Sequence, residues 1–505
     1  MRLIQGVDAY MTRAGLSLLV GLAACSSSTR SPDVTPAAAI AIAHVTVIDV
    51  TGGPPRSDAT VVVRGNRIAS IASGDSAIVP GDARVVEGRG KYLIPGLWDM
   101  HVHAAWRETA EPFAELFVAN GITGIREMWG DLGVIRDWRS HVADRDGARP
   151  RIYAAGNLVD GPNPVWPNSN RAADAREARE LVRSLRRDGA DFIKVYSRLP
   201  RDAYFAIAEE AKSLGIPFAG HVTIAVTAAE ASDAGQRSIE HLTGVVLGCS
   251  SLEDEIVRQV ATVIASRGWV AASGLSRGLG GLIDSTYDEA RCRSLAERFR
   301  RNETWQVPTL TVRYNITHLE DPRLERDPRL RYIPQFVRQR WADRSATIES
   351  GPAASAEGQQ ALQRREVAVT GLLFRAGVPI LAGTDVSNPY CLPGFSLHDE
   401  LARLVDAGLT PLGALQAATL NPARFLHATD SLGTVEVGKL ADLVLLDADP
   451  LADIHNTSRI AGVIVNGRFI DSAERERLLN DAAGASASMM RRPPPGRVPR
   501  RRPAL

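Results

Sequence analysis

The segment IPGLWDMHVH, residues 94–103, is an apolar, β-prone run that ends in two histidines separated by one valine. Successive side chains of a strand point to opposite faces, so His101 and His103 project together while Val102 points away. Two neutral imidazoles on one face can bind one divalent metal ion. The segment therefore predicts a strand that ends at a metal site.

The chain after this segment alternates short apolar runs with helical stretches. Residues 173–189 and 201–215 carry apolar side chains at three- and four-residue spacing and end in glycine, which is typical of amphipathic helices. Repeated units of this kind predict an α/β fold with a TIM-like (β/α)8 barrel, for which there are about eight or nine candidate strands. Besides residues 94–103, these are GITGIREMW, RIYAAGN, FIKVYS, PFAGHV, SIEHLTG, WVAAS, VPTLTV and PILAGTD.

Strand patterns also occur near both ends of the chain, where β-branched residues alternate with small or polar ones around glycine turns. They cover residues 40–72 and return in residues 433–470. Two such segments predict one small β-sandwich domain formed by both ends of the chain, with the barrel inserted into it. We place the boundaries at 38–95 and 431–475 for the β-sandwich and at 96–430 for the barrel.

The first residues of the chain predict export. Residues 1–24 contain Arg13 and a short apolar run, as in a signal peptide, and LAAC at 22–25 resembles a bacterial lipobox. The motif implies cleavage before Cys25 and lipidation of its thiol, whereas an ordinary secretory signal is the alternative. A lipid anchor predicts the bacterial cell envelope, at the periplasmic side of the outer membrane or the cell surface.

Two further segments are predicted to lack a packed core. Residues 25–37 are rich in Ser, Thr, Pro and Ala and are interpreted as a tether. Residues 476–505 end in a run of Arg and Pro without apolar periodicity, and we predict a disordered basic tail. The tail could contact anionic lipid, although a solvated tail is the preferred interpretation.

The charge composition of the chain limits the classes of molecule that it is expected to bind. Lys and Arg total 59 against 58 Asp and Glu, so no strong net charge directs the chain to nucleic acid. The expected partner is a small-molecule substrate, and a homo-oligomer is left open. Cys249, Cys292 and Cys391 match no CxxC metal or redox spacing, so we interpret them as buried or incidental thiols, with one bridge left open.

Ionisable residues stand at the ends of several predicted strands, which is where barrel enzymes place their catalytic groups. A single strand-end histidine is usually structural, a lone lysine usually pairs with a carboxylate, and an aspartate after a strand usually caps a helix. Packing does not readily explain the joint order His-x-His, Lys, His, His, Asp. The residues are His101, His103, Lys194, His221, His241 and Asp385.

This pattern resembles the metal-dependent amidohydrolase superfamily, and within it the imidazolonepropionase-like and zinc prolidase-like group. The resemblance covers roughly residues 38–475 and is stronger for the superfamily than for the substrate. Its segments follow the family's order: IPGLWDMHVH, IKVY, AGHV, IEHL, AGTDV, LHDELARLVDAGLTPLGALQAATLNPARFL and GTVEVGKLADLVLLD.

The resemblance implies two divalent metal ions, with zinc as the first choice and Mn²⁺, Co²⁺ or Fe²⁺ as alternatives. His101 and His103, together with Asp385, would hold the more buried ion. His221 and His241 would hold the second ion.

The resemblance also implies catalytic roles for two residues. Lys194 would bridge both ions as a carbamate formed with carbon dioxide, because a lysine near cations in an apolar strand is pushed toward its neutral, nucleophilic form. A hydroxide shared by the ions would attack the carbonyl carbon of the substrate. Asp385 would accept the proton of that hydroxide and pass it to the leaving nitrogen.

Three functions are compatible with this site. The first is hydrolysis of a C–N bond in a small substrate: an Xaa-Pro or other dipeptide, an N-acyl amino acid or a cyclic amide. The second is an esterase, lactonase or phosphotriesterase that uses the same binuclear site. The third is a catalytically silent binding lipoprotein, which the complete ligand set disfavours.

Substrate contacts are predicted from two loops. Tyr196 lies two residues after Lys194 and is a candidate to line the pocket or polarise a carbonyl, with packing as the alternative. The Arg-rich residues 313–366 are longer than one crossover helix needs, which predicts either a lid or a solvated helical insertion. Four residues at the start of this stretch are candidates to bind a substrate carboxylate, or else form a polar loop without a ligand role: Arg313, Tyr314, Asn315 and His318.

Overall fold

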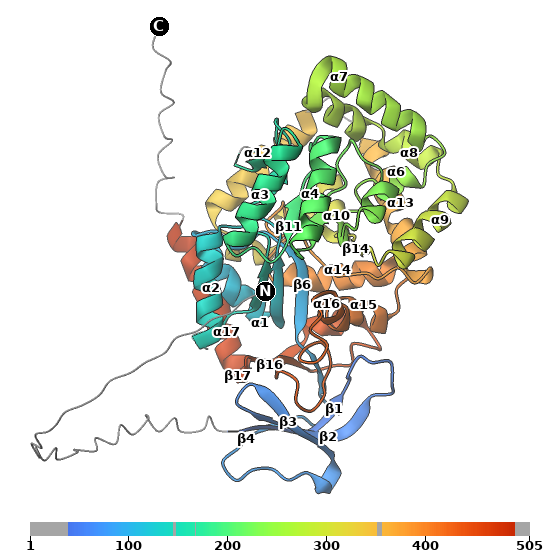
Figure 1. Cartoon of the computed structure of the whole chain (residues 1–505). Coiled ribbons are helices and arrows are strands. Elements are labelled where there is room, and N and C mark those ends of the chain that lie inside the picture. The colour runs from blue at the N-terminus through green and yellow to red at the C-terminus, as the bar shows by residue number, and fades with distance from the viewer. Residues whose placement is uncertain (1–38, 145–147, 167, 351–355, 490–505) are drawn as a thin grey trace, which may run out of the picture. The chain divides into compact units, whose positions relative to one another are not determined.

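The computed structural model describes residues 39–144, 148–166, 168–350 and 356–489 (Figure 1). These residues belong to one compact unit that begins at Ala38. The predicted signal peptide, Cys25 and the tether lie outside the described residues. None of the helices in the described part of the chain is long and apolar enough to cross a membrane.

Eight parallel segments form the barrel, and the prediction of a (β/α)8 barrel is confirmed. The last segment, residues 380–386, makes only single bridges, from Gln306 to Ile380 and from Val102 to Val386, but these join it to both neighbours and close the barrel. The other seven are β6 (Leu97–Val102), β7 (Ile122–Glu127), β8 (Arg151–Ala154), β11 (Ile193–Val195), β12 (Phe218–Gly220), β13 (Ser238–Glu240) and β14 (Trp305–Val307).

Helices surround these strands (Figure 1). The first predicted helix is α3, whose N-terminus is capped by Asp174 accepting a hydrogen bond from the backbone N–H of Glu177 at 2.9 Å. Its buried residues Ala178, Val182 and Leu185 follow the predicted spacing. The helices up to α9 are α1 (Ala110–Ala119), α2 (Leu132–Asp144), α3 (Ala175–Arg187), α4 (Arg201–Ser213), α5 (Ala228–Asp233), α6 (Val245–Gly248), α7 (Glu253–Gly278), α8 (Gly280–Ser285) and α9 (Glu289–Arg301).

One predicted strand is wrong. WVAAS, residues 269–273, lies inside α7, just after a non-helical residue, Gly268. The hydroxyl of Ser273 donates to the carbonyl of Trp269, four residues earlier, as in a helix. A five-residue apolar run carries no periodicity that separates a strand from a helix. Removing it from the candidates leaves eight barrel strands.

The terminal strands form one eight-stranded sheet, in which β5 pairs with β15 antiparallel and so joins the two ends of the chain. Buried Ile42, Val61, Leu445 and Ile464 share a core made only of residues of this sheet and its loops, so the sheet curls over its own face. The strands are β1 (Ile40–Val47), β2 (Arg56–Arg64), β3 (Arg67–Ser73), β4 (Arg84–Glu87), β5 (Tyr92–Pro95), β15 (Leu443–Leu446), β16 (Ile460–Val465) and β17 (Arg468–Asp471).

Most of the described part of the Arg-rich stretch 313–366 is helical. Part of it packs beside the last barrel strand: Trp341 is buried against Leu392, and its indole N–H donates to the carbonyl of Ser387 at 2.8 Å. Whether it acts as a lid stays a prediction. The later helices are α10 (Leu310–Thr317), α11 (Pro322–Glu325), α12 (Gln335–Ser350), α13 (Ala356–Arg375), α14 (Phe395–Asp406), α15 (Pro411–Ala417) and α16 (Leu420–Phe425).

The predicted disorder of residues 476–505 is wrong for its first part, because α17 (Ser472–Met489) is a helix that lies against α1. Ala482 is fully buried, and the hydroxyl of Ser486 donates to the carbonyl of Tyr332 at 2.6 Å. The sparse apolar residues of this helix gave no clear period, and its tertiary contacts stabilise it instead. Residues 490–505 lie outside the described part.

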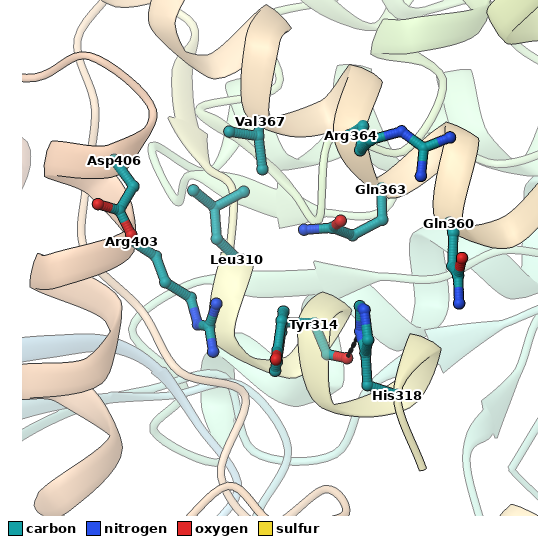
Figure 2. Close-up of a pocket in the computed structure, with 9 residues that line it drawn as sticks. All are labelled: Leu310, Tyr314, His318, Gln360, Gln363, Arg364, Val367, Arg403 and Asp406. Carbon is teal, nitrogen blue, oxygen red and sulfur yellow. Dashed lines mark hydrogen bonds between the residues drawn. The ribbon is translucent and has the colours of Figure 1, made fainter. Parts of the chain in front are cut away.

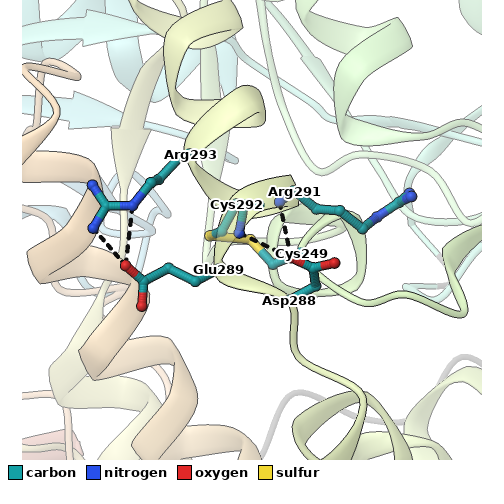
Figure 3. Close-up of a disulfide and its surroundings, with 7 residues drawn as sticks. Cys249, Asp288, Glu289, Arg291, Cys292 and Arg293 are labelled. Atoms are coloured by element: carbon teal, nitrogen blue, oxygen red, sulfur yellow. Dashed lines mark hydrogen bonds and ion pairs between the residues drawn. A yellow bond between two sulfur atoms is a disulfide. The ribbon is translucent and has the colours of Figure 1, made fainter.

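The bridge that the sequence left open joins Cys249 to Cys292 (Figure 3). Cys292 lies in the first turn of α9, which Asp288 caps by accepting the backbone N–H of Ala290 and of Arg291. The third thiol, Cys391, is buried and free. The interpretation of Cys249 and Cys292 as incidental thiols is therefore wrong.

Replacing Cys249 and Cys292 together by alanine is expected to lower the free energy of unfolding by about 2 to 4 kcal/mol, since the bridge restricts a loop of 43 residues in the unfolded chain. Urea unfolding measures this change. Thiol titration in denaturant should count two more thiols after reduction than before it. An unchanged count would contradict the bridge.

Candidate metal centre

The structure brings the predicted ligands to one end of the barrel, at the carboxyl ends of its strands. The backbone N–H of each of three ligands continues a strand ladder: His221 donates to Val195, His241 to Val307, and Asp385 to His101, at 2.8 to 3.0 Å. Because this backbone is fixed by the barrel, the side chains that follow the strands are fixed with it.

The carboxylate of Asp385 is the centre of the cluster. Its Oδ1 lies 2.9 Å from Nε2 of His103 and 3.4 Å from Nε2 of His101, and its Oδ2 lies 3.9 Å from Nε2 of His241. Ligand atoms of His101, His241 and Asp385 all lie within 4.8 Å of one another. The ring of His221 is 4.9 Å from that of His241. How the ligands divide between two ions stays a prediction.

In three of the histidines, the ring nitrogen Nδ1 has a hydrogen-bond partner that fixes the imidazole. Nδ1 of His101 lies 2.7 Å from Oε2 of Glu240, Nδ1 of His221 lies 2.8 Å from the hydroxyl of Ser197, and Nδ1 of His241 lies 2.7 Å from the hydroxyl of Thr309. A partner on Nδ1 fixes the orientation of the ring and leaves Nε2 for a metal. The three rings therefore present Nε2 to the centre of the site.

Backbone strain contributes to this arrangement. His241, Thr309 and Asp385 have φ values of 57°, 49° and 61°, in the left-handed region that residues other than glycine rarely adopt. Such conformations cost of order 1–3 kcal/mol each and cluster at functional sites. Regular strand geometry would send these side chains elsewhere.

Two glycines in the predicted motifs are needed because neighbouring atoms lie too close to leave room for a side chain. A Cβ on Gly383 would lie 2.8 Å from Cβ of His101, and a Cβ on Gly220 would lie 2.2 Å from the carbonyl oxygen of Val195. Neither contact is tolerable, so the AGTD and AGH segments require glycine before their ligands.

Lys194 points into the same centre. Its side chain is fully buried, and among the described residues Nζ has no hydrogen-bond partner. Burial, against the opposing charges of Glu240 and Asp385, lowers the pKa of Lys194 to about 8. Burial, followed by the charge of Lys194, also lowers the pKa of His101 well below its usual range.

These donors fit divalent metal ions. Nε2 of His101 is a buried nitrogen without a hydrogen-bond partner in the described part of the chain, as is Nζ of Lys194. Buried polar atoms are normally satisfied, so both atoms are suited to a ligand. Neutral imidazoles with a carboxylate form a donor set that suits Zn²⁺ and related ions.

The residues that sequence reasoning missed lie below the ligands, inside the barrel. Glu240 accepts hydrogen bonds from the guanidinium of Arg126 at 2.9 Å and from the hydroxyl of Ser238 at 2.5 Å, while it holds His101. Arg126 and Glu240 are fully buried. Both residues are polar and stand at alternating positions of buried strands. This was the signal in the sequence that could have identified them.

The predicted substrate residues divide into two groups. Tyr196 joins the site: its ring stacks on His221 with 4.0 Å between ring centres, and Nζ of Lys194 lies 5.8 Å from its ring centre. Arg313 instead donates to the buried carboxylate of Glu366 at 2.8 Å. A guanidinium engaged in this way gives no support to its predicted role toward a substrate carboxylate.

Of the other three candidates, Tyr314 and Asn315 lie in α10, and His318 directly follows it. Tyr314 and His318 stack on each other and face a cavity of about 310 Å³ between α10, α13 and α14, where Arg403 also points (Figure 2). The amide of Asn315 donates to the carbonyl of Tyr390 at 3.1 Å. None of these contacts involves the histidine cluster, so a role in substrate binding stays a prediction.

Comparison with known proteins agrees with the geometry. The model of the amidohydrolase family matches residues 346–470. An adenine deaminase from Moorella thermoacetica is 22% identical over 422 residues, which cover 82% of this chain and 54% of the relative. Together these matches support the amidohydrolase superfamily. The chain spans about half the length of this relative.

Further members and structures extend the comparison. An imidazolonepropionase from Pyrobaculum arsenaticum is 50% identical over 74 residues, which cover 14% of this chain and 18% of the relative. Among solved structures, a Xaa-Pro dipeptidase with bound methionine has a TM-score of 0.63 at 20% identity and covers 86% of this chain and all of its own. Bottromycin amidohydrolase has a TM-score of 0.66 at 25% identity, with coverages of 89% and 90%.

Glu240→Gln is expected to weaken metal retention by about 10- to 100-fold, because the ring of His101 loses its charged partner. The change also leaves the buried charge of Arg126 without its counterion, so the free energy of unfolding should fall by about 3 to 5 kcal/mol. Elemental mass spectrometry after dialysis and urea unfolding measure the two effects.

Glu180→Gln is the matched control. Glu180 forms an exposed ion pair with Arg176 on α3, and such pairs contribute little to stability. Equal losses of metal in the two variants would contradict the role given to Glu240.

Proposed function

We propose that this protein is a metal-dependent hydrolase that cleaves a C–N bond of a small substrate. The observation that carries the proposal is the convergence of four histidines, one lysine and one aspartate at the carboxyl ends of the barrel strands. A binding protein has no need of so many ligand groups around one carboxylate.

The relatives support this reaction class. An adenine deaminase and an imidazolonepropionase match in sequence, and a Xaa-Pro dipeptidase and an amidohydrolase match in fold. We propose Xaa-Pro or other dipeptides and N-acyl amino acids as candidate substrates.

The ligands would be His101, His103, His221, His241 and Asp385. When bound, divalent ions there would polarise the substrate carbonyl and make a water molecule acidic enough to attack it near neutral pH. Asp385 would take the proton from the attacking water and deliver it to the leaving nitrogen, for which its carboxylate has a central position.

Lys194 would complete the site as a carbamate. Its nitrogen would bond to the carbon of carbon dioxide and release a proton, which converts the amine into an anion with two oxygen donors. A buried amine whose pKa is lowered to about 8, with no hydrogen-bond partner among the described residues, is suited to this reaction.

The first experiment is to measure metal content and hydrolysis together. The parent protein is expected to hold about two equivalents of metal and to hydrolyse members of a panel of N-acyl amino acids, Xaa-Pro dipeptides and aryl esters. Lys194→Ala should lose both properties, and the exposed Lys212→Ala on α4 should keep both. Failure to bind metal after incubation with Zn²⁺ and bicarbonate would refute the mechanism, and cleavage of esters alone would refute the substrate class.

We also propose that the enzyme is lipid-anchored in the bacterial cell envelope. The LAAC motif at residues 22–25 is the basis, and the disulfide between Cys249 and Cys292 supports it, because disulfides persist in oxidising compartments. Cys25→Ala should move the protein from the membrane fraction to the soluble fraction of expressing cells. An unchanged distribution would argue against the anchor.

A further inference from the structure

Four aromatic side chains form an arc beside the metal centre: Trp106, Trp129, Trp166 and Tyr196. The ring centre of Trp129 lies 5.3 Å from that of Trp106 and 5.5 Å from that of Trp166. The indole N–H of Trp166 donates to the hydroxyl of Tyr196 at 3.0 Å. The members come from the loops after β6, β7, the short strand β9 (Val159–Asp160) and β11, so neighbouring parts of the barrel mouth build the arc together.

Two members of the arc, Trp129 and Tyr196, contact predicted metal ligands. Trp129 packs edge-on against His103, with 6.1 Å between ring centres, and Tyr196 stacks on His221 at 4.0 Å. A group that binds along the arc therefore extends directly from a substrate bond held among the histidines.

Two polar side chains, the partly buried Asn157 and the buried Asp160, fix the loops that carry these rings. The amide of Asn157 accepts the indole N–H of Trp129 at 2.6 Å and donates to the carbonyl of Asn168 at 2.8 Å. The buried carboxylate of Asp160 accepts the backbone N–H groups of Val165 and Arg198. Because the rings are held before a ligand arrives, little conformational entropy is lost on binding.

The four rings are only partly buried. Partly exposed tryptophans and tyrosines present large, rigid apolar area to a ligand, and aromatic pairs gain additional stability from offset or edge-to-face contact. A cationic ligand would also suit tryptophan faces. However, the guanidinium of Arg198 lies under the Trp166 loop, bonded to the carbonyl of Asn163 at 3.0 Å, and its positive charge disfavours a cation there.

We propose that the arc is the subsite for an aromatic or large apolar side chain of the substrate, and that it sets the substrate preference of the enzyme. This inference rests on the proposed hydrolase function for the cleavage step. The ligand is thus an amide or dipeptide with an uncharged aromatic or large apolar substituent next to the bond that is cleaved.

Matched substrate pairs test the proposal: Phe-Pro against Ala-Pro, and N-acetylphenylalanine against N-acetylalanine. The parent enzyme should favour the aromatic member of at least one pair. Trp166→Ala and Trp129→Ala should each lower the ratio of kcat/KM between aromatic and alanine substrates by about 10- to 100-fold. Trp166→Phe, which keeps a ring, should restore part of that ratio.

Phe205→Ala is the matched control, because Phe205 is a partly buried aromatic on α4, stacked under Arg201. It should leave the ratio unchanged. A parent enzyme without preference for the aromatic substrates would overturn the proposal. Tryptophan variants in which kcat/KM falls equally for both substrates of each pair, while circular dichroism shows a native fold, would also overturn it.

A binding measurement separates this inference from the hydrolase function. Protein incubated with Zn²⁺ is titrated with N-acetylphenylalaninamide and N-acetylalaninamide, with tryptophan fluorescence as the signal. Tighter binding of the aromatic probe, lost in Trp166→Ala, would support the arc even if no substrate is hydrolysed. Equal binding of the two probes would overturn the arc even if hydrolysis is found.

Discussion

The buried ion pair between Arg126 and Glu240 is the contact on which the centre of this barrel depends. Both side chains are fully buried, and a buried pair is tolerable only when its remaining hydrogen-bonding groups are satisfied. Arg126 also donates to the carbonyl of Met100, and Glu240 also holds His101. The same contacts that connect β6, β7 and β13 therefore orient a predicted metal ligand, so the core and the candidate metal centre form one network.

Other buried carboxylates also fix the chain through hydrogen bonds, in their case at the mouth of the barrel. Each accepts backbone N–H groups where a loop begins or a strand ends, and each thereby fixes the chain beside the site. Glu127 and Asp99 are fully buried, and burial raises the pKa of Glu127 to about 8 and that of Asp99 to about 7. The carboxylates are Asp99, Glu127, Asp160 and Glu400.

Sequence reasoning succeeded where a local pattern has a local cause. The apolar run before His101 and the glycines of AGH and AGTD could be interpreted because a strand, and a backbone contact, demand those residues. It failed where tertiary contacts decide: WVAAS is helical, and α17 is stabilised by contacts with distant segments. Glu240 stands next to a predicted ligand but was missed, since only the closed barrel brings Arg126 to it. The Trp129 and Trp166 contact likewise requires loops from different strands.

The pairing of β5 with β15 has a consequence for how the protein is made. Val444 pairs with Ile94, so the whole barrel separates the two partners along the chain. During synthesis, the N-terminal strands emerge long before the strand that completes their sheet. Contacts between such distant segments form slowly. Commitment to the native topology therefore comes late, when nearly all of the polypeptide has been released.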